Sequence, residues 1–343
     1  MAEINHNRKR AITLAILGCL GLAALFIFKS KKTEIRSMSG ITWATEYNIT
    51  YDSDKQLDDS ILTVFRKVDL SVSPFNKASR ITAINENQTS LMDDYLVILF
   101  DASREIWEAS EGAFDPTLSP LINAWGFGYK SGNLPTETQI DSLRQLVGFD
   151  KLKRIKHQLI KQDKRMSLNY SSIAKGFGCD EVGRMLERNG VENYLVEIGG
   201  EIVARGTNPR GEKWRISVDK PIESADSIIH ESAQIIELNN AAIATSGNYR
   251  NFKTDENGRH ISHIIDPKTG YSTSTDILSV TVVAKDCMTA DGWATALTVL
   301  GSEKAKATLQ KHPELAAMLI TRGTDGAFHI WTTDNYKKLI VSE

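Results

Sequence analysis

An aspartate and a threonine stand four residues apart near the C-terminal end of the chain, Asp291 and Thr295 in the phrase TADGWAT. Residues at this spacing share one face of a helix, so the carboxylate and the hydroxyl lie side by side. Hard oxygen ligands suit Mg²⁺, which takes few protein ligands and leaves positions for phosphate and water. The alternative is structural, with Asp291 near the positive end of a helix and Thr295 on its buried face.

A second stretch, SLNYSSIAKGFGCDEV at 167–182, combines small residues with one lysine. Small residues let the backbone approach a ligand, and a helix that begins there offers free N–H groups to an anion. Lys175 adds a positive charge. Neither common nucleotide fingerprint is present, because Gly176 and Gly178 lack the third glycine of G-x-G-x-x-G and the P-loop pattern is missing. The stretch is either a phosphate site or a tightly packed turn between a strand and a helix.

A histidine marks the third candidate region, the phrase HIIDPKTG at 263–270. The pattern predicts a strand at 261–265, and alternation places His263 and Ile265 on one side of it. The usual pKa of histidine lies near neutrality, which suits a general base. A single histidine in a strand can equally be structural, and its position alone does not decide between the two.

The elements that position these regions predict an α+β domain. Helical periodicity is found at 56–68, 91–110, 136–147 and 289–300, with a capping box at Thr136 and Gln139. Extended patterns are found at 38–51, 194–198, 202–205, 214–218, 235–238 and 279–284, followed by a closing hairpin at 317–332. Because the strands come in hairpin-like runs, we expect mixed or antiparallel sheets with flanking helices.

The composition indicates a folded protein with no excess of basic charge. The chain has 343 residues, of which 41% are hydrophobic and 24% charged, and its net charge is −2. Its length allows one large or two ordinary domains, and its charge argues against a nucleic-acid binder. Three scattered cysteines exclude a disulfide framework, and Cys179–Cys287 is the one conceivable intramolecular pair because Cys19 lies in an apolar run.

That apolar run, Ala11–Phe28, has eighteen uncharged residues between basic clusters and is long enough for a membrane span. No A-x-A cleavage site follows it, which favours an uncleaved signal anchor. The predicted organisation is a short cytoplasmic N-terminus, a transmembrane anchor, a linker and one large domain, at 1–10, 11–28, 29–37 and 38–343. Two alternatives are lipidation at Cys19, since Ile16–Cys19 is similar to a lipoprotein box, and a buried core helix.

Seven phrases between about Met38 and Gly301 resemble, in order, those of the ApbE-type FAD:protein FMN transferases. They are GAFDPT (112–117), IAKGFG (173–178), YLVEIGGEIVARG (194–206), AIATSGNYRNF (242–252), HIIDPKTGY (263–271), SVTVVA (279–284) and ADGWATAL (290–297). The resemblance implies a single α+β domain of the ApbE type, related to the T-fold. It also implies an enzyme that takes FAD and Mg²⁺ and moves FMN onto a threonine or serine hydroxyl of an acceptor protein, releasing AMP.

The same resemblance assigns roles to particular residues. It implies metal ligands at Asp291, Thr295 and the backbone carbonyl of Ser172. It implies FAD contacts at Met38, Phe75, Ala113, Phe114, Asp115, Asn169, Lys175 and Ile265. His263 matches a family histidine, which we interpret as the general base or as the group that orients the incoming hydroxyl. The expected acceptor is a subunit of a membrane redox complex, which places the domain on the exported, periplasmic side of the bacterial inner membrane.

Two positions depart from the family pattern. Many relatives have aspartate where this chain has Asn169, which can bind a flavin or adenine edge but carries no charge. Tyrosine is common where this chain has Phe75, which keeps ring stacking but loses a hydroxyl contact. Two other functions remain open, a Mg²⁺-dependent FAD pyrophosphatase giving FMN and AMP, and a non-catalytic flavin-binding protein. The sequence does not separate transfer from hydrolysis, because the nucleophile comes from outside the chain.

Overall fold

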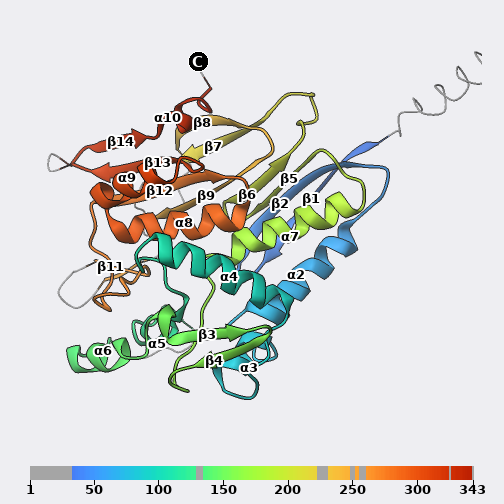
Figure 1. Ribbon diagram of the computed structural model, residues 1–343. Helices are drawn as coiled ribbons and strands as arrows, with labels where there is room; N and C mark the ends of the chain where they lie inside the picture. The colour runs from blue at the N-terminus through green and yellow to red at the C-terminus, as the bar shows by residue number, and fades with distance from the viewer. Residues whose placement is uncertain are drawn as a thin grey trace, which may run out of the picture.

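The computed structural model describes residues 33–128, 134–221, 231–247, 252–254, 260–323 and 326–341 (Figure 1). Its centre is an eight-stranded sheet with the order β1-β2-β5-β6-β9-β12-β13-β14. Every pair of neighbouring strands in this sheet is antiparallel. The prediction of an α+β fold with antiparallel strands is therefore confirmed.

The strands of the main sheet are β1 (Glu34–Thr42), β2 (Thr45–Ser53), β5 (Tyr194–Ile198), β6 (Glu201–Arg205), β9 (Ala241–Gly247), β12 (Ile277–Ala284), β13 (Ala316–Arg322) and β14 (Phe328–Thr332). Three smaller hairpins pair β3 (Leu152–Ile155) with β4 (Gln158–Lys161), β7 (Trp214–Asp219) with β8 (Ser232–Leu238), and β10 (Phe252–Thr254) with β11 (His260–Ser262). The closing hairpin predicted at 317–332 corresponds to β13 and β14.

Helices cover one face of the sheet in two layers (Figure 1). The inner layer is α7 (Ala174–Arg188) with α8 (Cys287–Leu300), and α2 (Asp58–Val72) and α4 (Asp94–Ala109) pack outside it. The remaining helices are α3 (Arg80–Asn85), η1 (Pro116–Leu118), α5 (Ser119–Ala124), α6 (Glu137–Arg144), η2 (Phe149–Lys151), α9 (Ser302–Lys311) and α10 (Asp334–Lys337). The capping box predicted at Thr136 and Gln139 is present at the start of α6.

The other face of the sheet is covered in part, from β5 to β13. Trp214 and Ile236 of the β7–β8 hairpin form a buried cluster with Met318, Ile320 and Tyr336. Burial on both faces explains why β12 and β13 are almost continuously apolar instead of alternating. The main core lies on the helical side, and the β12 and β13 strands are held between the two clusters.

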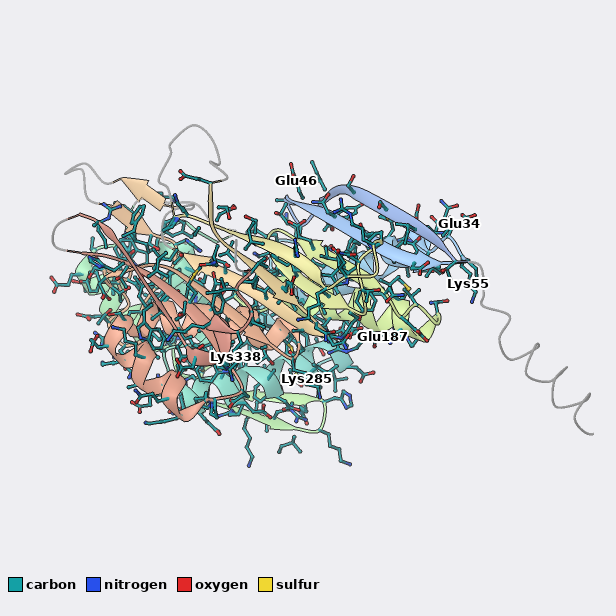
Figure 2. All side chains as sticks on the ribbon, turned by 90° about the horizontal axis from the view of Figure 1, so that it is seen from above. Glu34, Glu46, Lys55, Glu187, Lys285 and Lys338 are labelled. Atoms are coloured by element: carbon teal, nitrogen blue, oxygen red, sulfur yellow. The ribbon has the colours of Figure 1, made fainter. Side chains whose placement is uncertain are left out.

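The predicted extended stretch 38–51 is in fact a hairpin. A two-residue turn separates β1 from β2, and Trp43 and Ala44 have φ angles of 49° and 61°. Such turns usually carry Asn or Gly, so this pair gave no signal of a break. Strand β1 begins at Glu34, ahead of the predicted domain start at Met38. Figure 2 shows Glu34 at one end of this hairpin and Glu46 at the other.

Two further expectations are corrected around the candidate site. Strand β11 ends at Ser262, so His263 lies in a bend rather than within a strand, and Ile265 forms only an isolated bridge with Ser272. Residues 167–169 are irregular instead of forming the end of a strand. In both segments side-chain hydrogen bonds replace a ladder, since Ser262 Oγ accepts the N–H of Ile264 and Asn85 Oδ1 accepts the N–H of Leu168.

The predicted segments 1–10 and 11–28 lie outside the described residues. Among the residues that are described, no helix is long and apolar enough to cross a membrane. Cys179 and Cys287 are both buried with free thiols, so the conceivable disulfide between them is not formed.

Candidate active site

A cavity of about 790 Å³ opens beside the inner helix layer. This is the size of a typical small-molecule site. Eleven of the twelve predicted site residues line it: Phe75, Ala113, Phe114, Asp115, Asn169, Ser172, Lys175, His263, Ile265, Asp291 and Thr295. Met38 is not among the lining residues of the described chain, and its side chain packs from β1 against the main core instead.

A hydrogen bond between α7 and α8 lies at the wall of this cavity. The backbone N–H of Gly176, in the first turn of α7, donates to Oδ2 of Asp291 on α8 at 3.0 Å. In a regular helix this N–H would bind the carbonyl four residues earlier, that of Ser172. Among the described residues no backbone N–H reaches the Ser172 carbonyl, so it stays available.

The glycine at 176 is required by the close approach of the helices. A Cβ atom at this position would lie 2.3 Å from the carbonyl oxygen of Cys287 and 2.9 Å from Cβ of Asp291. Contacts this short do not occur, so α8 can sit against α7 only if residue 176 has no side chain. This glycine therefore serves the contact between the helices rather than a phosphate loop.

The start of α8 is fixed by two acids. Asp286 is the N-cap and accepts the N–H of Thr289 at 2.9 Å. Asp180, on α7, accepts the N–H groups of Cys287 and Met288 at 2.9 and 2.8 Å. Burial raises the pKa of the Asp180 carboxyl to about 7, although both N–H groups oppose the rise. These bonds satisfy the free N–H groups of the helix that carries Asp291.

Three oxygen groups at this corner fit a divalent cation of the Mg²⁺ type. Asp291 is 6% exposed, and its Oδ1 accepts no hydrogen bond within the described part of the chain. Thr295 lies one turn further along α8 and lines the same cavity, as does Ser172. A carboxylate, a hydroxyl and a free carbonyl are the hard ligands that Mg²⁺ prefers. Burial raises the pKa of the Asp291 carboxyl, so a cation beside it would favour its charged form.

The positive charge of Lys175 is already partnered. Its ammonium forms an ion pair with Glu201, whose side chain is only 3% exposed. Burial acts to lower the pKa of Lys175, but the charges of Glu201 and Asp291 raise it above its ordinary value. Lys175 is thus a charged group whose ammonium is held in the cavity wall by an acid.

His263 follows β11 directly in the chain. It lines the cavity, and its ring meets that of Phe127 edge-on with the centroids 6.3 Å apart. Lys253 of β10 donates to the carbonyl of Gly126 at 2.7 Å, which ties the β10–β11 hairpin to the segment that carries Phe127. The histidine is therefore held at the cavity by two neighbouring segments.

The residues expected to contact FAD differ in the groups that they expose to a ligand. Phe75 is 61% exposed, and its loop is anchored by a 2.5 Å hydrogen bond from Asn76 to Asp69. The carboxylate of Asp115 is engaged, because it accepts N–H groups from Thr117 at 2.8 Å and Phe149 at 3.1 Å. Asp115 thus shapes the wall and presents no free acid.

Asn169 and Ile265 complete that wall. Oδ1 of Asn169 accepts the N–H of Ser171 at 2.8 Å, so the amide nitrogen is the group left to face a ligand. An aspartate could make the same turn but would offer an acceptor instead of a donor. Ile265 is 2% exposed and belongs to a small apolar cluster with Leu118 and Trp125.

Comparison with known proteins shows the family to which this chain belongs. A model of the ApbE family matches residues 43–319. The chain belongs to the ApbE family. It is 36% identical over 344 residues to the FAD:protein FMN transferase of Haemophilus influenzae, a match that covers 95% of this chain and 96% of that protein.

Solved ApbE structures have the same fold. The flavin transferase ApbE from Vibrio cholerae is 34% identical with a TM-score of 0.80, over 90% of this chain and 99% of that chain. The apo form of the flavinyl transferase ApbE from Pseudomonas stutzeri is 30% identical with a TM-score of 0.80, over 92% of this chain and all of that one. The likeness covers the domain that holds the cavity.

Several lining residues were not singled out from the ApbE-like phrases. Trp43, Asp69, Glu201 and the β9 segment 245–247 all face the cavity. Glu201 lies in the phrase YLVEIGGEIVARG, and an acid directly after two glycines could have marked it. Trp43 and Asp69 carry no comparable signal, because their place in the wall depends on the tertiary packing of the β1–β2 turn and α2.

Proposed function

We propose that this protein transfers FMN from FAD to a serine or threonine hydroxyl of an acceptor protein, with Mg²⁺ as the metal. The observation that carries the proposal is the corner where Asp291, Thr295 and the free carbonyl of Ser172 open into a cavity that also contains His263. The names of the H. influenzae and V. cholerae relatives support the same reaction.

The reaction exchanges one phosphorus–oxygen bond for another. The acceptor hydroxyl oxygen bonds to the FMN phosphorus, the bond from that phosphorus to the bridging oxygen breaks, and AMP leaves with that oxygen. A bound divalent cation would neutralise charge on the pyrophosphate. Little covalent chemistry is left for the protein, so its residues act mainly by positioning and by electrostatics.

The residues of the chain divide this work. Asp291, Thr295 and Ser172 would hold the cation. His263 is placed to accept the proton of the incoming hydroxyl or to orient it. Phe75 offers an exposed ring for stacking, and the amide of Asn169 offers a donor to a ring edge.

Incubating the full chain with FAD, Mg²⁺ and a candidate acceptor domain tests the proposal. We expect the intact mass of the acceptor to rise by one FMN less one water. An acceptor variant with alanine in place of its target hydroxyl residue is the control. Release of free FMN and AMP without modified acceptor would favour a pyrophosphatase instead, and bound FAD without any AMP would favour a binding protein.

We also propose that residues 11–28 anchor the protein in the inner membrane, with the catalytic domain on the periplasmic side near an acceptor in a membrane redox complex. The support is the uncharged run between basic clusters. A phosphatase reporter that is active only outside the cytoplasm, fused to the C-terminus, should be active. A Cys19→Ser variant should stay in the membrane fraction, and its release would favour lipidation.

A further inference from the structure

Glu201 is a buried acid at the cavity that the proposed reaction has not used. It is the first residue of β6 and is reached through a two-residue turn, Gly199 and Gly200, with φ angles of 64° and 95°. Turns with positive φ at both positions fix the twist of a hairpin tightly. The hairpin therefore determines where the Glu201 carboxylate lies, and places it in the cavity wall with little exposure.

Two contacts hold Lys175 at that carboxylate. The ammonium pairs directly with Glu201. The aliphatic stem passes over Gly199, where a Cβ atom would lie 3.3 Å from Cδ of Lys175. Lys175 also occupies the first turn of α7, where a positive charge is disfavoured by the helix dipole. The helix dipole of α7 therefore does not explain the position of Lys175, whereas its contacts with Glu201 and Gly199 do.

The position of the pair links it to the proposed metal corner. Lys175 precedes Gly176, whose N–H binds Asp291, so the ammonium and the N–H start from adjacent residues of one helical turn. Asp291 also acts on Lys175 through its charge. Among the described residues only Glu201 forms a hydrogen bond or ion pair with the Lys175 ammonium, so without it the flexible lysine side chain would be held less firmly.

We propose that Glu201 is a positioning residue for the FMN transfer, which holds the Lys175 ammonium at the cavity floor beside Asp291, where it meets the pyrophosphate of FAD. This inference rests on the proposed function and adds a residue to it. Glu201 acts through Lys175, so the two should behave as one unit. Removing the negative charge of Glu201 should loosen Lys175 without making the cavity less attractive to the anionic FAD.

The test compares Glu201→Gln, Lys175→Met and the double variant in the full chain. Glu197→Gln is the matched control, because Glu197 lies on the same hairpin but bonds Asn48 outside the cavity. The measurements are kcat for transfer with Mg²⁺ and an acceptor, the Kd of FAD from its fluorescence without metal, and the thermal unfolding midpoint. The last shows whether each variant is folded.

We expect Glu201→Gln to lower kcat about a hundredfold, the cost of a small misplacement, while the Kd of FAD does not rise. The double variant should be no slower than the slower single variant, and the control should match the wild type. A merely structural role would raise Kd and lower the midpoint together with kcat. Such a combined change would overturn the inference. It would also be overturned by a wild-type kcat in Glu201→Gln, or by losses of kcat that multiply in the double variant. If the wild-type chain transfers no FMN in this assay, the proposed function is wrong, and this inference fails with it.

Discussion

The backbone N–H of Gly176 binds Oδ2 of Asp291 at 3.0 Å instead of the carbonyl of Ser172. This one bond orients an acid on α8 and leaves free a carbonyl in the turn before α7. Two of the three proposed cation ligands are therefore set by the way the helices meet, and the third, Thr295, follows from the helical spacing on α8.

Gly176→Ala should separate the two helices. Its Cβ would meet the Cys287 carbonyl, which is backbone and cannot turn away. Overpacking of this kind costs about 1–3 kcal/mol of unfolding free energy. We expect that loss in denaturant unfolding, together with transfer at least about tenfold slower because Asp291 shifts. Arg188→Ala, at an exposed position of α7, is the control. Unchanged stability and transfer would contradict this account of the contact.

His263→Ala should separate binding from chemistry. The ring lines the cavity against Phe127 and is not one of the proposed cation ligands, so FAD affinity should stay near that of the wild type. The transfer rate should fall by about 10²–10⁴, the usual contribution of general acid–base catalysis. Stopped assays of transfer and fluorescence titration with FAD measure both. The control is His312→Ala, which removes a ring that packs at a tilt against Trp293. If turnover is unaffected, His263 is structural.

Phe75→Ala should weaken binding with little effect on folding. The side chain is 61% exposed, so its removal should change the unfolding free energy by less than about 0.5 kcal/mol. Loss of ring stacking costs about 1 kcal/mol, which is roughly a fivefold rise in the Kd of FAD. Phe75→Tyr should bind as the wild type does, and Phe328→Ala on β14 is the control. An unchanged Kd in Phe75→Ala would remove Phe75 from the binding site.

Asp180 should make stability depend on pH. Burial raises its pKa to about 7 in the folded protein from an ordinary value of 3.8, so the folded state binds more protons between these values. Unfolding free energy should therefore fall as the pH rises through that window and level off above about 7. Between pH 5 and pH 8 this amounts to about 3 kcal/mol.

An Asp180→Asn variant isolates this contribution. We measure the unfolding free energy of both proteins in denaturant at pH 5 and pH 8. The wild type should lose stability relative to the variant at the higher pH. Any constant cost of the substitution, such as one lost bond to Cys287 or Met288, cancels in this comparison. A difference that does not change with pH would show that Asp180 is ionised throughout.

Elements whose sequence signals lie within a few neighbouring residues were predicted correctly. The helix at 289–300 is found as α8, which begins at Cys287 because Asp286 caps it. The capping box at Thr136 and the closing hairpin were likewise predictable, because turn, cap and periodicity lie within a few residues. The β1–β2 turn was missed because Trp43 and Ala44 adopt positive φ without a residue type that favours it.

The site required information that no single motif contains. Lys175, His263 and the Asp291–Thr295 pair lie in three separate stretches of the sequence, and the family-like phrases brought them together before the structure did. The partner of Lys175 was not predictable, because Glu201 reaches it only through the pairing of β5 with β6 and the packing of α7 on these strands. Met38 was predicted to contact FAD from the resemblance alone, but its side chain packs from β1 against the main core.

The most direct test of the central claim is a count of products. With FAD, Mg²⁺ and acceptor, the wild-type chain should release one AMP for each FMN attached to the acceptor. Asp291→Asn should give neither product, while Glu303→Gln, an exposed acid on α9, should match the wild type. AMP released in large excess over attached FMN, or full transfer by Asp291→Asn, would contradict the account.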